Sequence, residues 1–557
     1  MDSNRINDWK RAGLITEFDN SIQSYNAIAL GAINDGVFDN AWIVNDVIAD
    51  LDSGSTLYFP AGFYFFKSSL KLKSNVSIAG DLGKTYFVFD SMATAHGMVL
   101  QGKWAAGTQE IAKNASSKQT FLIVAGANFK LGDILYVGDM DSFHVFSNWA
   151  VNSTGQFIEV KKVSNDTVYL NNELRRDYLL SRYASVRRAN PIRNVSISNL
   201  ILIRKDSTVA QTSNVQLDMA YNCELHCVES YTANFAHVAI SNSLNVSING
   251  CYFKDANGYG SGGRGYGVAL QFASSECKLY NNVFEHLRHS ILLQAGANGN
   301  FIGYNYSSNP YWTQTSLPSD AAGDIVLHGN YVYANLFEGN EVQNIVIDDS
   351  HGINGPNNVF LRNRAGGYGI FMNPQIATDS QLFIGNEITN TAFPKGLYSL
   401  AGKGHFEFGN NVAGNCLPTN TQNVSLNSLY FNEIPAEYKS LNVWPVIGYP
   451  TVYASTPNLA HARNIQAVKT SCEELSSSVF GFEVGQVQML FPNPAVDYFS
   501  VTKGAFVSKI VIINTVGEEV ASFQSAAEHY SIALPAGIYW VKIFRGNTTS
   551  THKLVVI

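Results

Sequence analysis

The chain has 557 residues, of which only 15% are charged and 46% are hydrophobic, and its formal net charge is −7. This length corresponds to two to four domains, or to one long solenoid followed by a small module. The 37 Lys and Arg residues form no dense basic run, which argues against a nucleic-acid partner. No run of about 18 apolar residues marks a transmembrane segment, and the apolar composition excludes a disordered chain.

The start of the chain, Met1-Asp2-Ser3-Asn4, lacks a basic region followed by an apolar one. We therefore expect either a cytoplasmic protein or one whose signal peptide has been removed. The six cysteines form no CxxC pair. They are expected to be buried side chains, or to form one or two disulfides, rather than to bind zinc.

Residues 24–90 contain one helical segment among short β-type runs. A helix is predicted over Ala41–Leu51, followed by β-type runs at 55–66 (STLYFPAGFYFF) and 75–80 (NVSIAG). The helix comes before the repetitive part of the chain, so we expect it to cap the open end of a solenoid, where an unpaired strand edge would promote aggregation.

Similar short runs then recur with asparagines near their ends. The asparagines are Asn199, Asn222, Asn249, Asn282, Asn305, Asn340, Asn363, Asn386 and Asn410. Their basic step of 23 or 24 residues fits one coil of a right-handed parallel β-helix with three short strands per coil. Stacked Asn side chains would satisfy polar groups buried in its turns. The predicted fold class is therefore all-β, a single-stranded right-handed parallel β-helix with an N-terminal helical cap.

Two coils carry insertions, at Asp255–Gly265 and Ser307–Ala322. Inserted loops on a solenoid tend to gather on one face and form its binding site. Arg264 lies in the first insertion, and Tyr311 with Trp312 in the second. The two aromatic residues are expected either to stack on a sugar ring or to pack the loop onto the coil.

Three motifs carry a resemblance to a known family. The segments ALGAINDGVFDN (29–40), STLYFPAGFYFF and NVSIAG are similar to the first coils of the pectate-lyase-like single-stranded right-handed β-helix superfamily. The resemblance covers roughly residues 20–460. It implies the fold and leaves the reaction open, because the superfamily includes pectin hydrolases, polysaccharide lyases and phage tailspikes.

The C-terminal segment resembles a different family. From Phe491 the chain reads FPNPAVDYFSV, then SKIVIINTVGEEV, ALPAGIYWVKI and finally HKLVVI, which is similar to the type A sorting domain of the type IX secretion system. Alternating apolar residues between Gly and Pro turns predict a small antiparallel β-sandwich. The resemblance implies the type IX machinery as a partner and a secreted or cell-surface location, with the signal peptide removed. The predicted domains are a β-helix over 1–463, a linker over 464–488 and the sorting domain over 489–557.

The repeating asparagines allow each residue to be numbered within its coil, and residues at the same position of successive coils should lie in one column. His289, Asp324 and the pair Asp348/Asp349 fall near one column on three successive coils. His328 and His351 fall in a second column, which Leu270 and Leu293 also occupy. Either the side chains of that column do not all point outward, or the register between coils is shifted by one residue. With Arg288, these residues form a candidate catalytic cluster beside the second insertion.

Three functions remain open. The leading hypothesis is a secreted polysaccharide-degrading glycoside hydrolase, in which two of Asp324, Asp348 and Asp349 act as acid and as base or nucleophile. The alternative enzyme is a polysaccharide lyase using Arg288 and His289, with help from Arg264, and with Ca²⁺ bound by Asp324 and Asp348. No other cofactor is expected. The third hypothesis is that the chain is a non-catalytic glycan-binding surface protein.

Overall fold

The structure is a computed structural model that describes most of the chain. The described residues are 3–16, 23–260, 263–311, 323–372, 377–441, 443–450, 456–472, 490–491, 495–501, 508–515, 517–524, 527, 529–545 and 548–557. The chain divides into two units, Met1–Ser476 and Ser477–Ile557. The predictions that concern Trp312 and Pro492–Pro494 lie outside the described residues.

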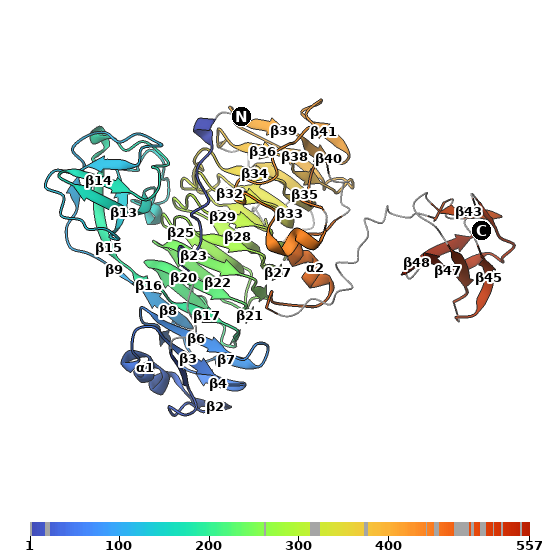
Figure 1. The fold of residues 1–557 in the computed structure, drawn as a ribbon, viewed down its shortest axis with the longest axis horizontal. Helices are drawn as coiled ribbons and strands as arrows, with labels where there is room; N and C mark the ends of the chain where they lie inside the picture. Colours follow the sequence, from blue (N-terminus) through green and yellow to red (C-terminus); the bar gives the residue numbers. More distant parts are fainter. Residues whose placement is uncertain are drawn as a thin grey trace. The chain divides into compact units, whose positions relative to one another are not determined.

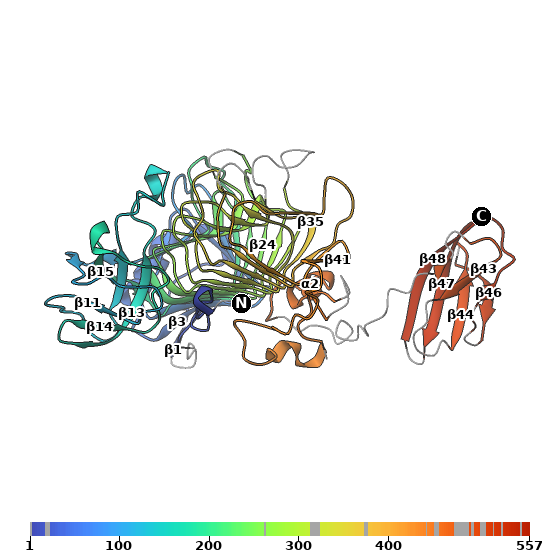
Figure 2. The same ribbon diagram turned by 90° about the horizontal axis from the view of Figure 1, so that it is seen from above.

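The first unit is a parallel β-helix, as predicted (Figure 1). Each central coil contributes one strand to each of three parallel faces, and the coils overlie one another when seen from above (Figure 2). The inward side chains are mostly Val, Ile, Leu and Phe, and they form one continuous core along the stack. Such strands are buried on their inner face, which accounts for the low charge of the sequence.

The first face is one continuous sheet. Its strands are β1 (Gln23–Asn26), β3 (Ser55–Phe59), β6 (Val76–Gly80), β16 (Ile192–Arg193), β17 (Ser196–Ser198), β20 (Ala220–His226), β23 (Leu244–Asn249), β26 (Lys278–Tyr280), β29 (Phe301–Gly303), β32 (Leu336–Glu338), β34 (Val359–Leu361), β36 (Leu382–Ile384) and β39 (Phe406–Phe408).

The other two faces are joined by the long strands β33 (Glu341–Ile347) and β35 (Arg364–Met372). The second face contains β2 (Asp35–Asp39), β4 (Gly62–Phe66), β7 (Thr85–Phe89), β18 (Ile201–Arg204), β21 (Glu229–Tyr231), β24 (Tyr252–Lys254), β27 (Val283–Glu285), β30 (Tyr306–Ser308), β37 (Glu387–Ile388), β40 (Asn410–Val412) and β41 (Asn415–Leu417). The third face contains β5 (Leu70–Lys71), β8 (Met98–Gln101), β19 (Val215–Asp218), β22 (Ala236–Ser241), β25 (Tyr266–Gln271), β28 (His289–Leu293), β31 (Ile325–Leu327) and β38 (Leu397–Ser399).

A ladder of buried asparagines connects the later coils. Each side-chain amide before the last donates to the next asparagine's Oδ1 at 2.8–3.1 Å, and also to a strand carbonyl of the preceding coil. Its members are Asn282, Asn305, Asn340, Asn363, Asn386 and Asn410, as the spacing predicted. The prediction was wrong for Asn249, because Cys251 holds the ladder position in that coil and its backbone N–H donates to Asn282. Asn222 belongs to a separate ladder through Asn194.

Two segments of the N-terminal region pack against the solenoid. The predicted helix is present as α1 (Ala41–Asp50), which buries Ala41, Val44 and Ile48 in the solenoid core. The short 3₁₀ helix η1 (Ser3–Arg5) begins a segment that runs along the coils, where the buried Trp9 indole N–H donates to the Ala334 carbonyl at 2.7 Å. The capping role of α1 stays a prediction.

A module of mainly antiparallel strands, not predicted from the sequence, interrupts the solenoid between β8 and β16. It has its own hydrophobic core and lies beside the coils (Figure 1). Its elements are β9 (Lys103–Trp104), β10 (Gln109–Glu110), β11 (Phe121–Ile123), β12 (Ile134–Gly138), η2 (Asn148–Ala150), β13 (Gln156–Ser164), β14 (Thr167–Leu170), η3 (Leu180–Arg182) and β15 (Ser185–Asn190). We call residues 103–190 the lateral module.

The lateral module is fixed to the solenoid by buried polar contacts. Arg175 of the module forms an ion pair with Glu276 of the solenoid at 2.6 Å, and both side chains are almost fully buried. Gly296 lies so close to the module that an added Cβ would stand 1.9 Å from the Ser153 carbonyl oxygen, and its φ is +73°. These contacts set the module's position against the coils.

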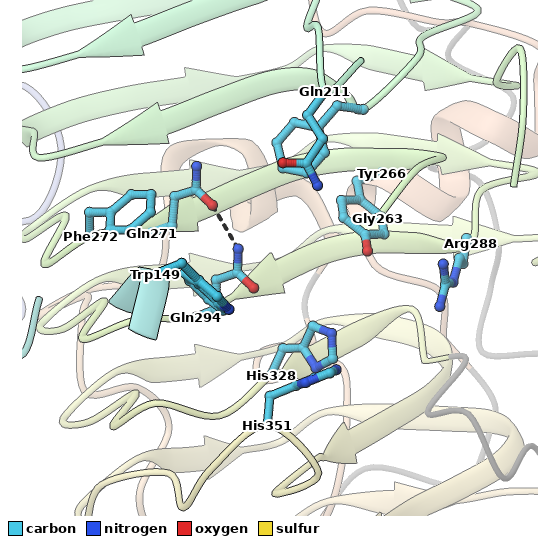
Figure 3. A pocket seen from close by; sticks show the side chains of 11 residues that line it. Trp149, Gln211, Gly263, Tyr266, Gln271, Phe272, Arg288, Gln294, His328 and His351 are labelled. Atoms are coloured by element: carbon cyan, nitrogen blue, oxygen red, sulfur yellow. Dashed lines mark hydrogen bonds between the residues drawn. The ribbon is translucent and has the colours of Figure 1, made fainter. Parts of the chain in front are cut away.

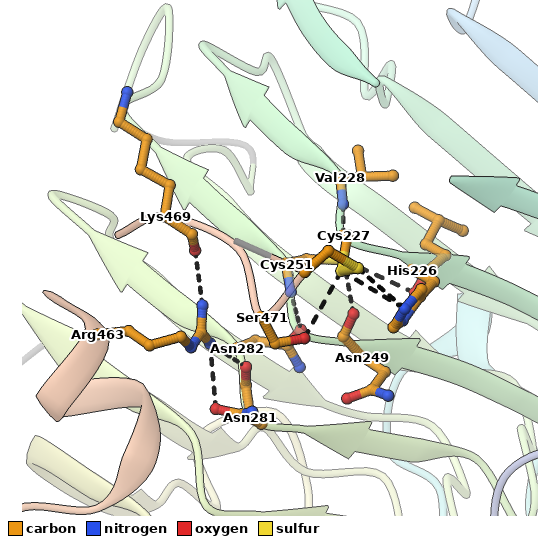
Figure 4. Close-up of a disulfide and its surroundings, with 12 residues drawn as sticks. His226, Cys227, Val228, Asn249, Cys251, Asn281, Asn282, Arg463, Lys469 and Ser471 are labelled. Carbon is orange, nitrogen blue, oxygen red and sulfur yellow. Dashed lines mark hydrogen bonds between the residues drawn. A yellow bond between two sulfur atoms is a disulfide. The ribbon is translucent and has the colours of Figure 1, made fainter. Parts of the chain in front are cut away.

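The chain returns across the solenoid after the last coil. This return segment contains η4 (Ala436–Leu441) and α2 (Leu459–Ile465). Arg463 donates to the Asn281 carbonyl, and Cys472 forms a disulfide with Cys227 (Figure 4). The predicted linker of 464–488 therefore starts too early, because its first nine residues are fixed to the β-helix.

The second unit has two antiparallel sheets around one core. One sheet contains β42 (Leu490–Phe491), β43 (Tyr498–Val501) and β46 (Tyr530–Ser531), and the other β44 (Lys509–Ile513), β45 (Glu519–Phe523), β47 (Gly537–Arg545) and β48 (Thr548–Val556). Buried residues of both sheets, among them Phe499, Ile512 and Val541, belong to the same hydrophobic cluster.

The disulfide yields a stability prediction. The double variant Cys227→Ser/Cys472→Ser is expected to lower the free energy of unfolding of the first unit by about 2–4 kcal/mol, because the bond closes a long loop in the unfolded chain. A urea titration of the full chain measures this. The matched control is Cys416→Ser, since Cys416 is a free, half-buried thiol. Equal midpoints for the double variant and the wild type would contradict the prediction.

Candidate functional site

An open cleft of about 490 Å³ lies where the third face of the solenoid meets the lateral module (Figure 3). Ends of several strands line it: Tyr266 begins β25, Gln271 ends β25, and His328 directly follows β31. The lining residues are Trp149, Gln211, Phe235, Gly263, Tyr266, Gln271, Phe272, Arg288, Gln294, His328 and His351.

The strand register aligns a row of polar residues at one end of this face. Leu270 pairs with Leu293 and Leu293 with Leu327, which places Gln271, Gln294 and His328 one above another. Gln294 donates to Gln271 Oε1 at 2.7 Å. The next pairing, Leu327 with Ile347, brings His328 beside Asp348. The sequence left two possibilities for the column of His328. The structure has the register that is shifted by one residue, in which His328 aligns with Gln294 and not with Leu293.

His328 and Asp348 form the central pair of the site. The His328 Nδ1 atom lies 2.8 Å from Asp348 Oδ2, and the Asp348 side chain is 1% exposed. Burial would raise the pKa of Asp348, but the contact with His328 and the Ser350 backbone N–H hold it well below its usual range. A carboxylate beside Nδ1 favours the imidazole tautomer that is protonated at that nitrogen.

A row of aromatic rings runs through the same coils. Tyr266 stacks on His289 at 5.0 Å, His289 meets His328 at 6.0 Å, and His328 meets His351 at 4.5 Å between ring centroids. Burial, reinforced by His328 and Arg288, lowers the pKa of His289 to about 3. His289 is 1% exposed and donates from Nδ1 to the Gly323 carbonyl at 2.9 Å, so it is neutral and supports the rings beside it.

Arg288 and Tyr266 supply the other polar groups of the cleft. Arg288 donates one N–H to the Gly260 carbonyl at 2.9 Å and lines the cleft. Burial raises the pKa of Tyr266, while the charge of Arg288 partly opposes this, so the phenol is protonated at neutral pH. Partial burial and the charge of His328 lower the pKa of His351.

Asp324 does not line the cleft. Its Oδ2 accepts from the Gln343 and Asn344 backbone N–H groups at 2.9 and 2.8 Å, and its Oδ1 accepts from Ser307 at 2.6 Å. Asp324 aligns with Asn344, at the opposite end of the strands from Asp348. The two positions are four residue steps apart, about 13 Å along a strand.

Asp349 also has a structural environment. Its carboxylate accepts from the Asn354 backbone at 2.9 Å and from the Thr378 backbone at 2.8 Å, and it also binds the Thr378 hydroxyl. Burial raises the pKa of Asp349 despite these hydrogen bonds. The catalytic roles proposed for Asp324 and Asp349 stay predictions, and the geometry of neither residue favours them.

The positions of Asp324 and Asp348 do not favour the two as a catalytic pair or as shared calcium ligands, and both roles stay predictions. Glycosidase carboxyl groups stand about 5–9.5 Å apart across the substrate, whereas Asp324 and Asp348 are held at opposite strand ends by other partners. The same separation is longer than a pair of ligands on one calcium ion requires. Over the described ranges, His226, Cys227 and Cys472 are the single group with metal-ligand spacing, and the two cysteines are bonded to each other.

Of the predicted substrate-binding residues, Tyr311 and Arg264 are not among the side chains that line the cleft. Tyr311 stacks on Tyr259 with ring centroids 4.1 Å apart, which packs its loop onto the neighbouring insertion. Arg264 follows Gly263 of the lining, and its Nε is buried without a hydrogen-bond partner in the described part of the chain. Trp312 lies outside the described residues.

Sequence reasoning missed Trp149, Tyr266, Phe272 and the two glutamines. Gln271 and Gln294 are 23 residues apart, which is the coil repeat, so the correct register would have identified them. Trp149 belongs to the lateral module, and no repeat connects it to the coils.

Comparison with known proteins agrees with both resemblances. Residues 24–281 match the family model described as rhamnogalacturonase A/epimerase, pectate lyase-like, and residues 489–557 match the secretion system C-terminal sorting domain. The first unit is thus a parallel β-helix whose residues 24–281 match a pectate-lyase-like family model, and the second unit matches a sorting domain. The sorting domain indicates type IX secretion and a secreted or cell-surface protein.

Among solved structures, the chain resembles the tailspike gp61 of Pseudomonas phage phi297, with a TM-score of 0.52 and 16% identity over 70% of this chain and 75% of that one. For the gp54 tailspike of Acinetobacter baumannii bacteriophage AP22, the TM-score is 0.43 and the identity 16% over 68% of each chain. For the AlgE4 A-module, a mannuronan C-5 epimerase of Azotobacter vinelandii, they are 0.34 and 13% over 69% of this chain and 96% of the module. The comparison with curated proteins found no match.

The family model indicates a carbohydrate-binding or carbohydrate-acting protein. None of the helices in the described ranges is long and apolar enough to span a membrane.

Asp324 yields a pH prediction. Burial raises the pKa of Asp324 from 3.8 to about 6, against the opposing effect of its hydrogen bonds. Since the folded state holds this proton more tightly, the contribution of Asp324 to stability is present below about pH 4 and is lost as the pH rises to about 6. The loss is about 3 kcal/mol at 1.4 kcal/mol per pKa unit.

Urea titrations at pH 4, 5, 6 and 7 measure this dependence. The variant Asp324→Asn is expected to flatten the decline in unfolding free energy between pH 4 and 6. Slopes are compared rather than absolute values, because the variant also changes hydrogen bonds. Identical slopes in the two proteins would contradict the raised pKa.

Proposed function

We propose that the chain is a secreted polysaccharide lyase that cleaves uronate-containing glycans by β-elimination, with His328 as the base. The observation that carries this proposal is the His328–Asp348 pair at 2.8 Å in a cleft whose described lining contains Arg288 and Tyr266 but no carboxylate. This is the alternative that the sequence left open, with His328 in place of His289.

The base is oriented by a buried carboxylate. Asp348 lies beside Nδ1 of His328, so in this proposal it orients the ring and leaves Nε2 for the substrate, as the aspartate of a serine-protease triad orients its histidine. His289 is a poorer base, because burial disfavours its protonated form. Asp348 is therefore a positioning residue.

The elimination then needs an acid and a counter-charge. Nε2 of His328 takes the proton from C5 of the uronate, the electron pair forms the C4–C5 double bond, and the bond from C4 to the glycosidic oxygen breaks. The leaving oxygen takes a proton from the Tyr266 hydroxyl. Arg288 pairs with the uronate carboxylate and stabilises the negative charge that develops beside C5.

Comparing the activities of the variants Asp348→Asn and Asp324→Asn distinguishes the lyase mechanism from a hydrolase mechanism. His328→Ala and Asp348→Asn are each expected to lower kcat by about 10²–10⁴-fold. Asp324→Asn is expected to retain kcat within about tenfold, since Asp324 binds strand backbone away from the cleft. Circular dichroism checks that each variant folds.

Activity is measured on a panel of plant and algal polysaccharides by ultraviolet absorbance and by reducing ends together. A lyase raises both signals, because its product is an unsaturated uronide. Reducing ends alone, lost in Asp324→Asn, would overturn the proposal in favour of a hydrolase. Retention of glycan with neither signal would indicate a binding protein.

A further inference from the structure

We propose that Trp149 of the lateral module and Phe272 of the solenoid form a subsite for an uncharged sugar residue next to the reacting uronate. This inference rests on the proposed function and names a substrate class: polysaccharides in which uronate and uncharged sugars are neighbours. It starts from the uneven distribution of charge along the cleft.

The two ends of the cleft differ chemically. Arg288 lies at one end, and Trp149, Phe272, Gln271 and Gln294 lie at the other, where none of these lining side chains is charged (Figure 3). Tyr266 and Gln271 are the first and last residues of β25, five steps or about 17 Å apart. This span exceeds one sugar ring, so the two ends contact different residues of one glycan chain. His328 follows the same strand row as Gln294, but its ring meets that of His289, which stacks on Tyr266, so it reaches from that row towards the Arg288 end.

Trp149 offers a free aromatic surface at the uncharged end. Its side chain is 49% exposed although it lines the cleft, and it stands edge-on to Phe272 with ring centroids 5.9 Å apart and an interplanar angle of 86°. Two rings at a right angle form an apolar corner. The apolar C–H face of a sugar ring packs well on such a surface.

The backbone at Phe272 supports a specific role for its ring. Phe272 has a φ of +50°, in the left-handed region that disfavours bulky side chains. The equivalent turn positions, which follow the same register, are Asn242, Ala295 and Gly329. Phe272 contacts the Val145–Ala150 cluster of the module with part of its surface and lines the cleft as well.

The two glutamines supply matching hydrogen bonds. Gln271 donates to Ser241 Oγ at 3.1 Å and accepts from Gln294 at 2.7 Å, which fixes both amides in one orientation. This leaves the Gln294 carbonyl oxygen turned towards the open cleft (Figure 3). An uncharged amide oxygen accepts a hydrogen bond from a sugar hydroxyl and would repel a carboxylate.

The test compares Trp149→Ala and Trp149→Phe with the control Phe143→Ala. Phe143 lies on the same module, is 63% exposed and is not part of the cleft lining. The substrates are polysaccharides of alternating uronate and uncharged sugar (hyaluronan, rhamnogalacturonan) and uronate homopolymers (polygalacturonate, alginate).

Kinetics and binding are measured separately. Trp149→Ala is expected to raise KM at least tenfold on an alternating polymer, with kcat changed less than threefold, while Trp149→Phe recovers most of the loss and Phe143→Ala has no effect. The subsite proposal would be overturned if Trp149→Ala raised KM on homopolymers alone. It would also be overturned if Trp149→Ala had the wild-type KM on every polymer that the protein cleaves.

Binding distinguishes the failure of this inference from the failure of the proposed reaction. In the background of His328→Ala, gels containing each polymer report retardation without turnover. If an alternating polymer retards the protein, and Trp149→Ala abolishes this, the subsite stands even where no lyase activity is found. If no alternating polymer retards the protein, or if Trp149→Ala is retarded equally, the subsite is excluded.

Discussion

The register between stacked coils is the constraint on which the rest of the structure depends. Side chains alternate across a strand, so a slip of one residue would turn every inward side chain outward. The Asn282–Asn410 ladder opposes such a slip, because each amide binds both the next coil's amide and a strand carbonyl of the previous coil. The same register brings His328 beside Asp348 and stacks Gln271 under Gln294. The cleft chemistry is therefore a consequence of how the coils are aligned.

The lateral module turns one exposed face of the solenoid into a cleft. A bare coil surface is nearly flat, and polymer bound to it would remain largely hydrated. The module places Trp149 against Phe272, and the buried Arg175–Glu276 pair holds it there at 2.6 Å. Removing one partner of such a pair would leave an uncompensated buried charge, so the position of the module is strongly determined. Rigid placement of this kind is what a binding site requires.

Three aspartates of similar sequence context have different environments. Asp348 is paired with a histidine that lines the cleft, whereas Asp324 and Asp349 accept hydrogen bonds from strand and turn backbone. Burial raises the pKa of the latter two, and the histidine contact lowers that of Asp348. These opposite shifts depend on partners that come from other coils. The spacing in the sequence could group the three residues but could not assign them different roles.

The sequence by itself determined the parallel β-helix, the helix at 41–50 and the sorting tail. Each of these is a local or periodic feature, a coil repeat of 23 residues, a helical segment or a set of ordered motifs, and such features are readable along one chain. It also selected His328, His351, Arg288 and Asp348 as candidates. Only the tertiary structure decided the one-residue register, the separation of Asp324 from Asp348 and the arrival of Trp149 from the module. These depend on hydrogen bonds and burial between segments up to about two hundred residues apart, for which the chain carries no local signal.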